Sequence, residues 1–434
     1  MNLPPGPSES RLRSTLKWQF RATAVMHAAR QRYGDVWLLR LLGSTDFVIV
    51  SDPELLRDVY SADPAVLHTG VGTVGKPLMG ARSVLLLDED DHTSMRKLMA
   101  PGFRSEQVRQ YRGVTERICE QELAGWPLNE ALPLLPLMEG ITLNVIMSAI
   151  FGVTEDDRRE LLRERISGVV DWGSSPARMA RLMISQRRDN PAPSSFRKVV
   201  DALDEVVFDV IKQAREDPRL DGRDDILAML LQSRFDDGSP MTDRDLRDTL
   251  VTLLIQGHAS TADGLCWALE RLIRHPEVYE RLREEARTED EEYLDAVVKE
   301  TLRVRPPLPI ASRLVMQPYT LGEYELEPGI LIAPCIYMVH RREDVYPEPE
   351  RFRPERFLEK PAERDTWMPF GGGVRGCLGA SFALHEIKTV LRTLMLRARF
   401  ATTDEPDEPI VRRRIGFAPG RGARATLVER LPAP

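Results

Sequence analysis

The sequence predicts a mainly α-helical protein with small β-sheets. Residues 89–305 carry a mostly helical apolar pattern broken at proline- and glycine-rich points, and another helix is expected over about 380–396. Strand-like segments lie near 36–50, 310–336 and 410–429. Because strands flank a helical middle, we expect one interwoven domain over residues 1–434.

Near the N-terminus, two short strands, Val36–Leu41 and Phe47–Val50, enclose a turn, and Asp52-Pro53 starts a helix over Glu54–Ser61. The glycine-rich stretch Gly70–Gly80 is expected to be a mobile loop. It lacks the Gly-Lys-Ser/Thr ending of a phosphate-binding loop.

The longest helices are expected over Ser194–Glu216 and Asp243–Arg274. Thr242 with Asp245 forms a capping-box-like start for the second of them. A strand pair is expected from Tyr319–Leu326 and Gly329–Ile336.

Composition excludes several classes of protein. The chain has 60 basic and 67 acidic residues, and no basic block that would favour nucleic acid as a partner. Its four cysteines show no C-x-x-C spacing, which fits a reducing cytosol and argues against a zinc site. The most apolar segment, Ala131–Gly152, is interrupted by Pro133, Pro136 and Glu139. We therefore expect a cytoplasmic protein without a membrane anchor.

The most informative stretch runs from Phe370 to Gly379, where a cysteine follows a glycine-rich loop and precedes a helix. A helix N-terminus favours the thiolate form, and thiolate is a known axial ligand of haem iron. The alternative is a buried structural cysteine after a turn.

This stretch resembles the haem-binding loop of the cytochrome P450 superfamily, F-x-x-G-x-R-x-C-x-G. The resemblance implies the triangular helical prism of that family, with haem b held by Cys377 as the iron ligand. It also implies that Phe370, Gly371 and Gly379 shape the haem-binding loop.

Two further stretches carry the same resemblance. Glu300 and Arg303 match the family's E-x-x-R helix, and Arg356 lies in a P-E-R-F segment. The resemblance implies a structural triad of these three residues beneath the haem loop. An ordinary surface ion pair is the alternative for Glu300 and Arg303.

Four cationic groups are implied to bind the haem propionates: His92 and Arg96 in an H-x-x-x-R pattern, Arg313, and Arg375. For the first two, the alternative is a solvated helix face capped by Asp91.

The middle of the longest helix resembles the oxygen-side helix of the family, A-G-x-(D/E)-T-(T/S). Gly257 is implied to make room for dioxygen, but Ala259 stands where the acid is expected and Ser260 where threonine is. The hydroxyls of Ser260 and Thr261 remain as candidate proton carriers. Helix packing is the alternative for Thr261, and His258 is expected to face away.

The resemblance implies a haem-thiolate monooxygenase of the soluble bacterial type. It would insert one atom of O2 into a small, largely apolar substrate by hydroxylation or epoxidation, in secondary metabolism. NAD(P)H electrons would arrive through ferredoxin reductase and ferredoxin, and the protein would be a monomer. Basic residues expected on the docking face are Arg96, Lys97, Arg364 and Lys388, and apolar residues expected to line the substrate site are Leu254, Leu308, Ile310, Ile415 and Phe417.

Two alternatives remain open. Because Ala259 replaces the acid, the enzyme would be an atypical one with peroxide-driven, rearrangement or coupling chemistry. The second alternative is a haem-binding sensor without catalysis.

Overall fold

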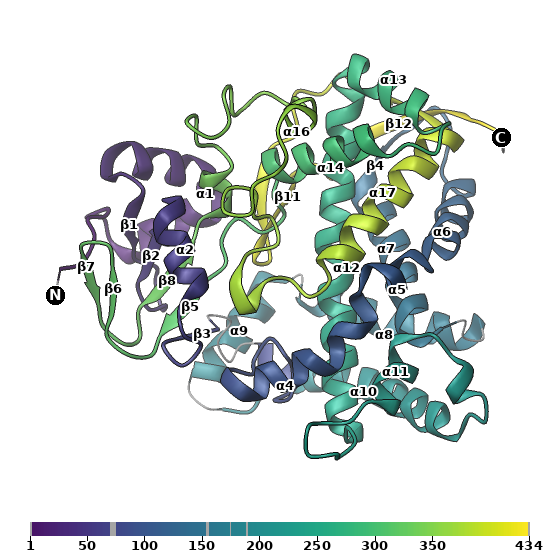
Figure 1. Cartoon of the computed structure of the whole chain (residues 1–434), viewed down its shortest axis with the longest axis horizontal. Helices are drawn as coiled ribbons and strands as arrows, with labels where there is room; N and C mark the ends of the chain where they lie inside the picture. The colour runs from purple at the N-terminus through teal and green to yellow at the C-terminus, as the bar shows by residue number, and fades with distance from the viewer. Residues whose placement is uncertain (1, 70–74, 153–155, 174, 188–189, 433–434) are drawn as a thin grey trace. The chain divides into compact units, whose positions relative to one another are not determined.

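A computed structural model of the chain describes residues 2–69, 75–152, 156–173, 175–187 and 190–432. The described chain is mainly α-helical with small sheets, as the sequence predicts (Figure 1). It forms two compact units that alternate along the sequence. The first comprises residues 1–70, 115–139 and 260–434, and the second comprises residues 71–114 and 140–259.

Every sheet found among the described residues belongs to the first unit. Its elements are α1 (Arg11–Tyr33), β1 (Val36–Leu39), β2 (Phe47–Val50), α2 (Pro53–Ser61), β3 (Leu67–Thr69), β4 (Ala131–Pro133), α13 (Pro276–Glu285), α14 (Glu292–Val304), β5 (Arg313–Val315), β6 (Tyr319–Leu321), β7 (Tyr324–Leu326), β8 (Leu331–Pro334), α15 (Ile336–Val339), α16 (Arg356–Glu359), the 3-10 helix η4 (Gly373–Arg375), α17 (Ala380–Arg397), β9 (Ala398–Thr402), β10 (Ile410–Arg413), β11 (Gly416–Pro419) and β12 (Arg424–Arg430).

The largest sheet has the order β1-β2-β8-β5-β3, and only β2 and β8 pair in parallel. Leu38 and Val48 contact α2 on one face, whereas Trp37 and Ile49 contact α1 on the other. Side chains alternate along a strand, so helices on both faces explain why β1 is buried throughout.

Some predicted boundaries and pairings are wrong. The first strand ends at Leu39 rather than Leu41, and α2 starts at Pro53, where the Asp52 side chain accepts backbone hydrogen bonds. Tyr319–Leu326 is itself a hairpin, β6–β7, turning at Gly322 with positive φ. Its expected partner instead forms β8 in the large sheet.

Helices make up the second unit. They are α3 (Lys76–Met79), α4 (Glu89–Met99), the 3-10 helix η2 (Ala100–Phe103), α5 (Ser105–Arg109), α8 (Asp156–Gly173), α9 (Pro176–Arg187), α10 (Ser194–Glu216), the 3-10 helix η3 (Leu220–Gly222) and α11 (Ile226–Gln232). Of the loop expected over Gly70–Gly80, residues 70–74 lie outside the described residues, and much of the remainder forms α3 instead.

Three helices run from one unit into the other: α6 (Arg112–Ala124), α7 (Leu134–Phe151) and α12 (Asp243–Ile273). By length and composition, α7 is apolar enough to cross a membrane, although Pro136 and Glu139 interrupt it as noted from the sequence. Two-thirds of this helix is buried within the protein, as in a core helix.

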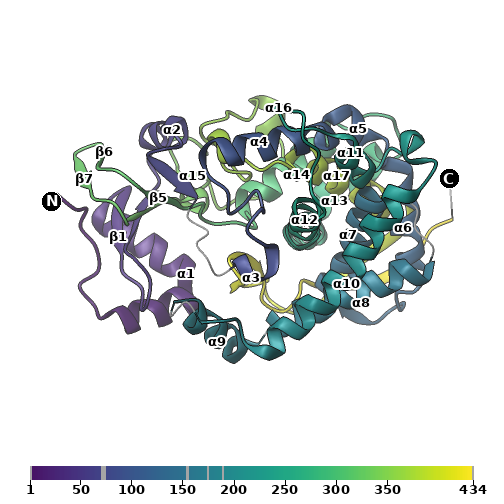
Figure 2. The ribbon, with the colours of Figure 1, turned by 90° about the horizontal axis from the view of Figure 1, so that it is seen from below.

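α12, seen nearly end-on in Figure 2, begins with the predicted capping box. The Asp245 carboxylate accepts hydrogen bonds from the Thr242 backbone N–H and hydroxyl, at 3.0 and 2.6 Å, and the Asp245 N–H donates to the Thr242 hydroxyl at 3.1 Å.

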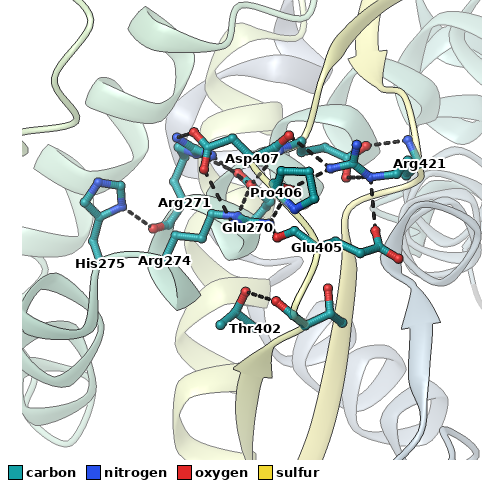
Figure 3. Close-up of polar contacts among 11 residues, drawn as sticks. Glu270, Arg271, Arg274, His275, Thr402, Glu405, Pro406, Asp407 and Arg421 are labelled. Carbon is teal, nitrogen blue, oxygen red and sulfur yellow. Dashed lines mark hydrogen bonds and ion pairs between the residues drawn. The ribbon is translucent and has the colours of Figure 1, made fainter.

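At its other end, α12 is tied to the segment after β9 (Figure 3). The buried Glu270 carboxylate pairs with Arg271 at 2.5 Å and Arg274 at 2.6 Å. Arg274 also donates to the carbonyl oxygens of Glu405 and Pro406. These contacts satisfy a buried charge and fix the end of α12 within the first unit.

Candidate functional site

The loop before α17 is shaped by close packing on Tyr60. A Cβ at Gly373 would lie 2.1 Å from the Tyr60 carbonyl oxygen, and one at Gly372 would lie 2.6 Å from its ring. Gly373 also has φ +65°, which disfavours other residues. The loop closes when the Cys377 N–H donates to the Phe370 carbonyl oxygen at 2.9 Å.

Cys377 is exposed just before α17, whereas Cys119, Cys266 and Cys335 are buried. Burial raises the pKa of all three buried thiols, that of Cys335 to about 12, so they remain neutral. The alternative of a buried structural cysteine is therefore wrong for Cys377.

The surroundings of Cys377 suit a flat anionic group such as haem. The space in which a side chain at Gly371 or Gly379 would lie is open. Arg313 in β5 lies close to the loop, and its Nη2 donates to the Gly372 carbonyl oxygen at 3.3 Å. A thiol, open space and a nearby guanidinium together fit a thiolate-ligated haem with negatively charged propionates.

Glu300, Arg303 and Arg356 lie together in the first unit. Arg303 donates to both Glu300 oxygens at 2.7 and 2.9 Å, and Arg356 Nε donates to Oε1 at 3.0 Å. Glu300 and Arg303 are fully buried, so the alternative of a surface ion pair is wrong. The Arg353 N–H also donates to Glu300, which ties the P-E-R-F segment to α14.

A buried histidine connects this cluster to the cysteine loop. Arg303 donates to the His340 carbonyl oxygen at 2.7 Å, and the Met368 N–H donates to His340 Nε2 at 3.0 Å. Burial, together with the charges of Arg303 and Arg341, lowers the pKa of His340 to about 3. The ring therefore stays neutral and can accept this hydrogen bond at neutral pH.

In the second unit, His92 is buried on the inner face of α4, and Arg96, one turn later, is half-buried. The alternative of a solvated, Asp91-capped face is wrong, because the helix starts at Glu89 with Asp88 as its N-cap residue. Met95, from the same buried face, contacts the Thr249 hydroxyl on α12.

The middle of α12 differs partly from expectation. A Cβ at Gly257 would lie 2.9 Å from Ile146 of α7, so this glycine makes room for helix packing rather than for dioxygen. His258 is buried and its Nδ1 bonds the Leu254 carbonyl oxygen at 2.7 Å. Ser260 is exposed and Thr261 is buried. Of the two hydroxyls, Ser260 is therefore the accessible one.

Asp263, which the sequence reasoning missed, follows Ser260 by three residues on the same helix face. Its Oδ1 is buried without a hydrogen-bond partner. Burial raises the pKa of Asp263 to about 7; Glu139 adds to the rise, and Arg413 and Arg414 oppose it. A carboxylate one helical turn after the candidate hydroxyl of Ser260 was the signal that could have identified it.

The exposed residues in the middle of α12 form one stripe. Gln256 and Ser260 are exposed, and Ala259 and Asp263 are half-buried, whereas the helix is buried from Gly264 to Ile273. Residues spaced by three, four and seven lie on one helix face. This stripe is the open face of α12, and Asp263 ends it.

Two of the residues expected to line the substrate site, Leu254 and Phe417, are instead buried in the core. Leu254 is fully buried, and Phe417 is buried against Tyr337, with ring centroids 5.4 Å apart. Ile415 is 68% exposed at the turn between β10 and β11. Ile310 packs against the core cluster that contains Trp37.

Comparisons with known proteins identify the family of the chain. Residues 4–422 match the family model described as "Cytochrome P450". The protein named "Putative cytochrome P450 135B1" of Mycobacterium tuberculosis is 36% identical over 98% of this chain and 91% of its own length. "Putative cytochrome P450 138" of the same species is 35% identical over 99% and 97%. The solved structure titled "Retinoic acid bound cyanobacterial CYP120A1" has a TM-score of 0.84, 22% identity and coverage of 99% and 100%.

The fold and the cysteine loop define a haem-thiolate protein. The chain belongs to the cytochrome P450 family, so it is a monooxygenase, an oxidoreductase whose cofactor is haem iron.

Proposed function

We propose that this enzyme inserts one atom of O2 into a small, largely apolar organic substrate, by hydroxylation or epoxidation. The observation that carries the proposal is the exposed Cys377 thiol in a loop fixed on Tyr60, with Arg313 beside it. When bound, haem b supplies the activation of dioxygen. The chain supplies the iron ligand, proton transfer and substrate orientation.

The chain's share in holding haem is assigned as follows. Cys377 binds the iron, while Phe370, Gly371 and Gly379 give the loop its shape. The propionates pair with His92, Arg96, Arg313 and Arg375. Glu300, Arg303 and Arg356 act as the structural triad, because their buried contacts fix the segments that lead into the loop.

Protons are proposed to reach the active site through Ser260. Its hydroxyl is exposed, whereas Thr261 is buried and contributes to packing. Side chains on a helix lean toward its N-terminus, so the Asp263 carboxyl is directed back toward Ser260. A carboxyl with a pKa near neutrality can act as the proton source of a relay: the Ser260 hydroxyl, or an adjacent water, would accept its proton while passing its own proton on toward the active site. The carboxylate would then take up a proton from solvent, so that Asp263 serves in place of the acid absent at Ala259.

The ferrous carbonyl spectrum tests the iron ligand. The wild-type protein should show the long-wavelength Soret band of thiolate ligation, and Cys377→Ser should lose it. Cys266→Ala, a change at a buried cysteine, is the control and should keep it. A wild-type spectrum without that band, or an unchanged Cys377→Ser spectrum, contradicts the assignment. Product formation with NAD(P)H, ferredoxin reductase and ferredoxin would then exclude the sensor alternative.

Ferredoxin is the proposed electron donor. The basic residues expected on the docking face differ in how close their acidic neighbours lie. Lys97 pairs with Asp236 at 2.5 Å, and Lys388 lies 3.4 Å from Glu291 and 3.6 Å from Asp295. Arg364 is exposed. Arg364→Glu should therefore slow ferredoxin-driven turnover more than Lys388→Glu, and should spare peroxide-driven turnover. Equal losses in both assays would contradict this docking face.

Because Ala259 stands where an acid is expected, peroxide-driven chemistry is the second candidate function. If Ser260 and Asp263 suffice for protons, Ala259→Glu should leave the coupling of NAD(P)H to product unchanged or lower it. A large gain in coupling would favour the second candidate. We further propose that the enzyme works as a cytoplasmic monomer in secondary metabolism.

A further inference from the structure

The first helix, α1, exposes an apolar stripe. Leu12, Leu16 and Phe20 follow one another at intervals of four residues and are 55%, 51% and 77% exposed. This spacing places them along one face of a helix. Neighbouring Leu42 is 57% exposed.

The stripe belongs to a firmly held part of the fold. Trp18, on the same segment of α1 as the stripe, packs in one core cluster with the fully buried Trp37 of the large sheet, and so do Ala22, Met26 and Ala29 beyond a kink at Arg21. The segment that carries Leu42 is joined to α1, because the Leu42 N–H donates to the Thr15 hydroxyl at 2.7 Å. The exposed leucines and phenylalanine are therefore presented outward by a fixed helix.

Positive charge flanks the stripe. α1 contains six Arg or Lys residues and no Asp or Glu, in a chain of net charge −7. Arg13 and Lys17 share the single carboxylate of Glu9, at 3.5 and 2.5 Å, and Arg21 is exposed. The face is thus both apolar and basic, in a chain whose net charge is negative.

The apolar and basic side chains of α1 together fit one kind of binding partner. A second copy of the chain would bring two basic helices together across a two-fold contact, which like charges oppose. Nucleic acid would use the basic residues but leave the leucines and phenylalanine exposed. An anionic lipid surface satisfies both sets, because apolar side chains enter the acyl boundary while Arg and Lys contact phosphates.

We propose that α1 docks the protein on the surface of an anionic lipid bilayer. Leu12, Leu16 and Phe20 enter the boundary between headgroups and acyl chains. Arg13, Lys17 and Arg21 contact lipid phosphates. The contact is peripheral, and it is independent of the proposed chemistry at the haem site.

Sedimentation of the full-length holoprotein with lipid vesicles tests the proposal. Binding is expected to vesicles that mix phosphatidylglycerol with phosphatidylcholine, and to weaken as salt is raised. The double variant Leu16→Asp/Phe20→Asp should lower partitioning by roughly tenfold or more. Arg13→Glu/Arg21→Glu should weaken binding to the anionic vesicles by a similar factor.

Leu128→Asp is the matched control, because Leu128 is 41% exposed and lies outside α1. It should bind like the wild type. An unchanged ferrous carbonyl spectrum and melting temperature show that each variant is folded. The proposal is overturned by absent binding to anionic vesicles, by equal binding to pure phosphatidylcholine, or by double variants that bind like the wild type. A dimer that the apolar double variant dissociates would also overturn it, in favour of a second copy as the occupant.

Discussion

Replacing Asp263 by asparagine should stabilise the protein by an amount that grows with pH. Burial raises the pKa of Asp263 from 3.8 to about 7. Between these values the native state keeps a proton that the unfolded state releases, so the native state loses stability as pH rises through this range and remains destabilised above it. Asparagine has the shape of the carboxylic acid but does not titrate, so Asp263→Asn removes this loss.

The expected size follows from the two pKa values. Each unit of pKa difference corresponds to about 1.4 kcal/mol. Asp263→Asn should therefore raise the free energy of unfolding by about 2 kcal/mol at pH 5 and by about 4 kcal/mol at pH 8. Below pH 4 the variant and the wild type should be equally stable.

Urea unfolding of the wild type and the variant at pH 4, 5 and 8 measures this difference. Asp404→Asn, at an exposed aspartate, is the control and should change little with pH. A stability difference for Asp263→Asn that is the same at all three pH values would refute the reasoning, because it would show that Asp263 titrates alike in the folded and unfolded chain.

Three further predictions concern the first unit. Glu300→Gln should lower the free energy of unfolding in urea by about 3–5 kcal/mol, because two buried guanidinium groups lose their anion. The control Arg57→Gln removes an exposed ion pair with Asp365 and should lower it by less than about 1 kcal/mol. Similar losses in the two variants would contradict a buried network. Gly373→Ala should lower haem content sharply, because the added Cβ would collide with Tyr60. The control Gly329→Ala, also at positive φ but in open space, should keep haem and lower the free energy of unfolding by only about 1–2 kcal/mol. Equal haem content in the two variants would argue against the role of Tyr60. His340→Gln should make the protein less sensitive to acid. Because the pKa of His340 is lowered in the folded state, the wild type loses stability as pH falls below 6.5, by about 3 kcal/mol at pH 4.5. Unfolding of both proteins at pH 7 and 4.5 measures whether the wild type alone shows this loss.

The sequence predicted correctly those elements that depend on residues close together along the chain. The bounds of α10 and the capping box of α12 follow from apolar spacing and from side chains three residues apart. α1 was not predicted. Leu12, Leu16 and Phe20 are apolar but exposed, and the helix kinks at Arg21, so its apolar residues do not mark a single buried face.

Sequence alone was enough to determine the class of this protein, and it predicted Cys377 as the iron ligand. The fixed spacing from Phe370 to Gly379 and the E-x-x-R pattern are contiguous, and a contiguous motif keeps its geometry because few backbone angles separate its residues. Tertiary structure decided which of these side chains are buried and what they contact. It brought Tyr60 against Gly373 and directed Gly257 toward Ile146 rather than toward an open site. It also placed Asp263 where burial is the largest cause of the rise in its pKa to about 7. Burial depends on distant segments of the chain, which no local pattern reveals.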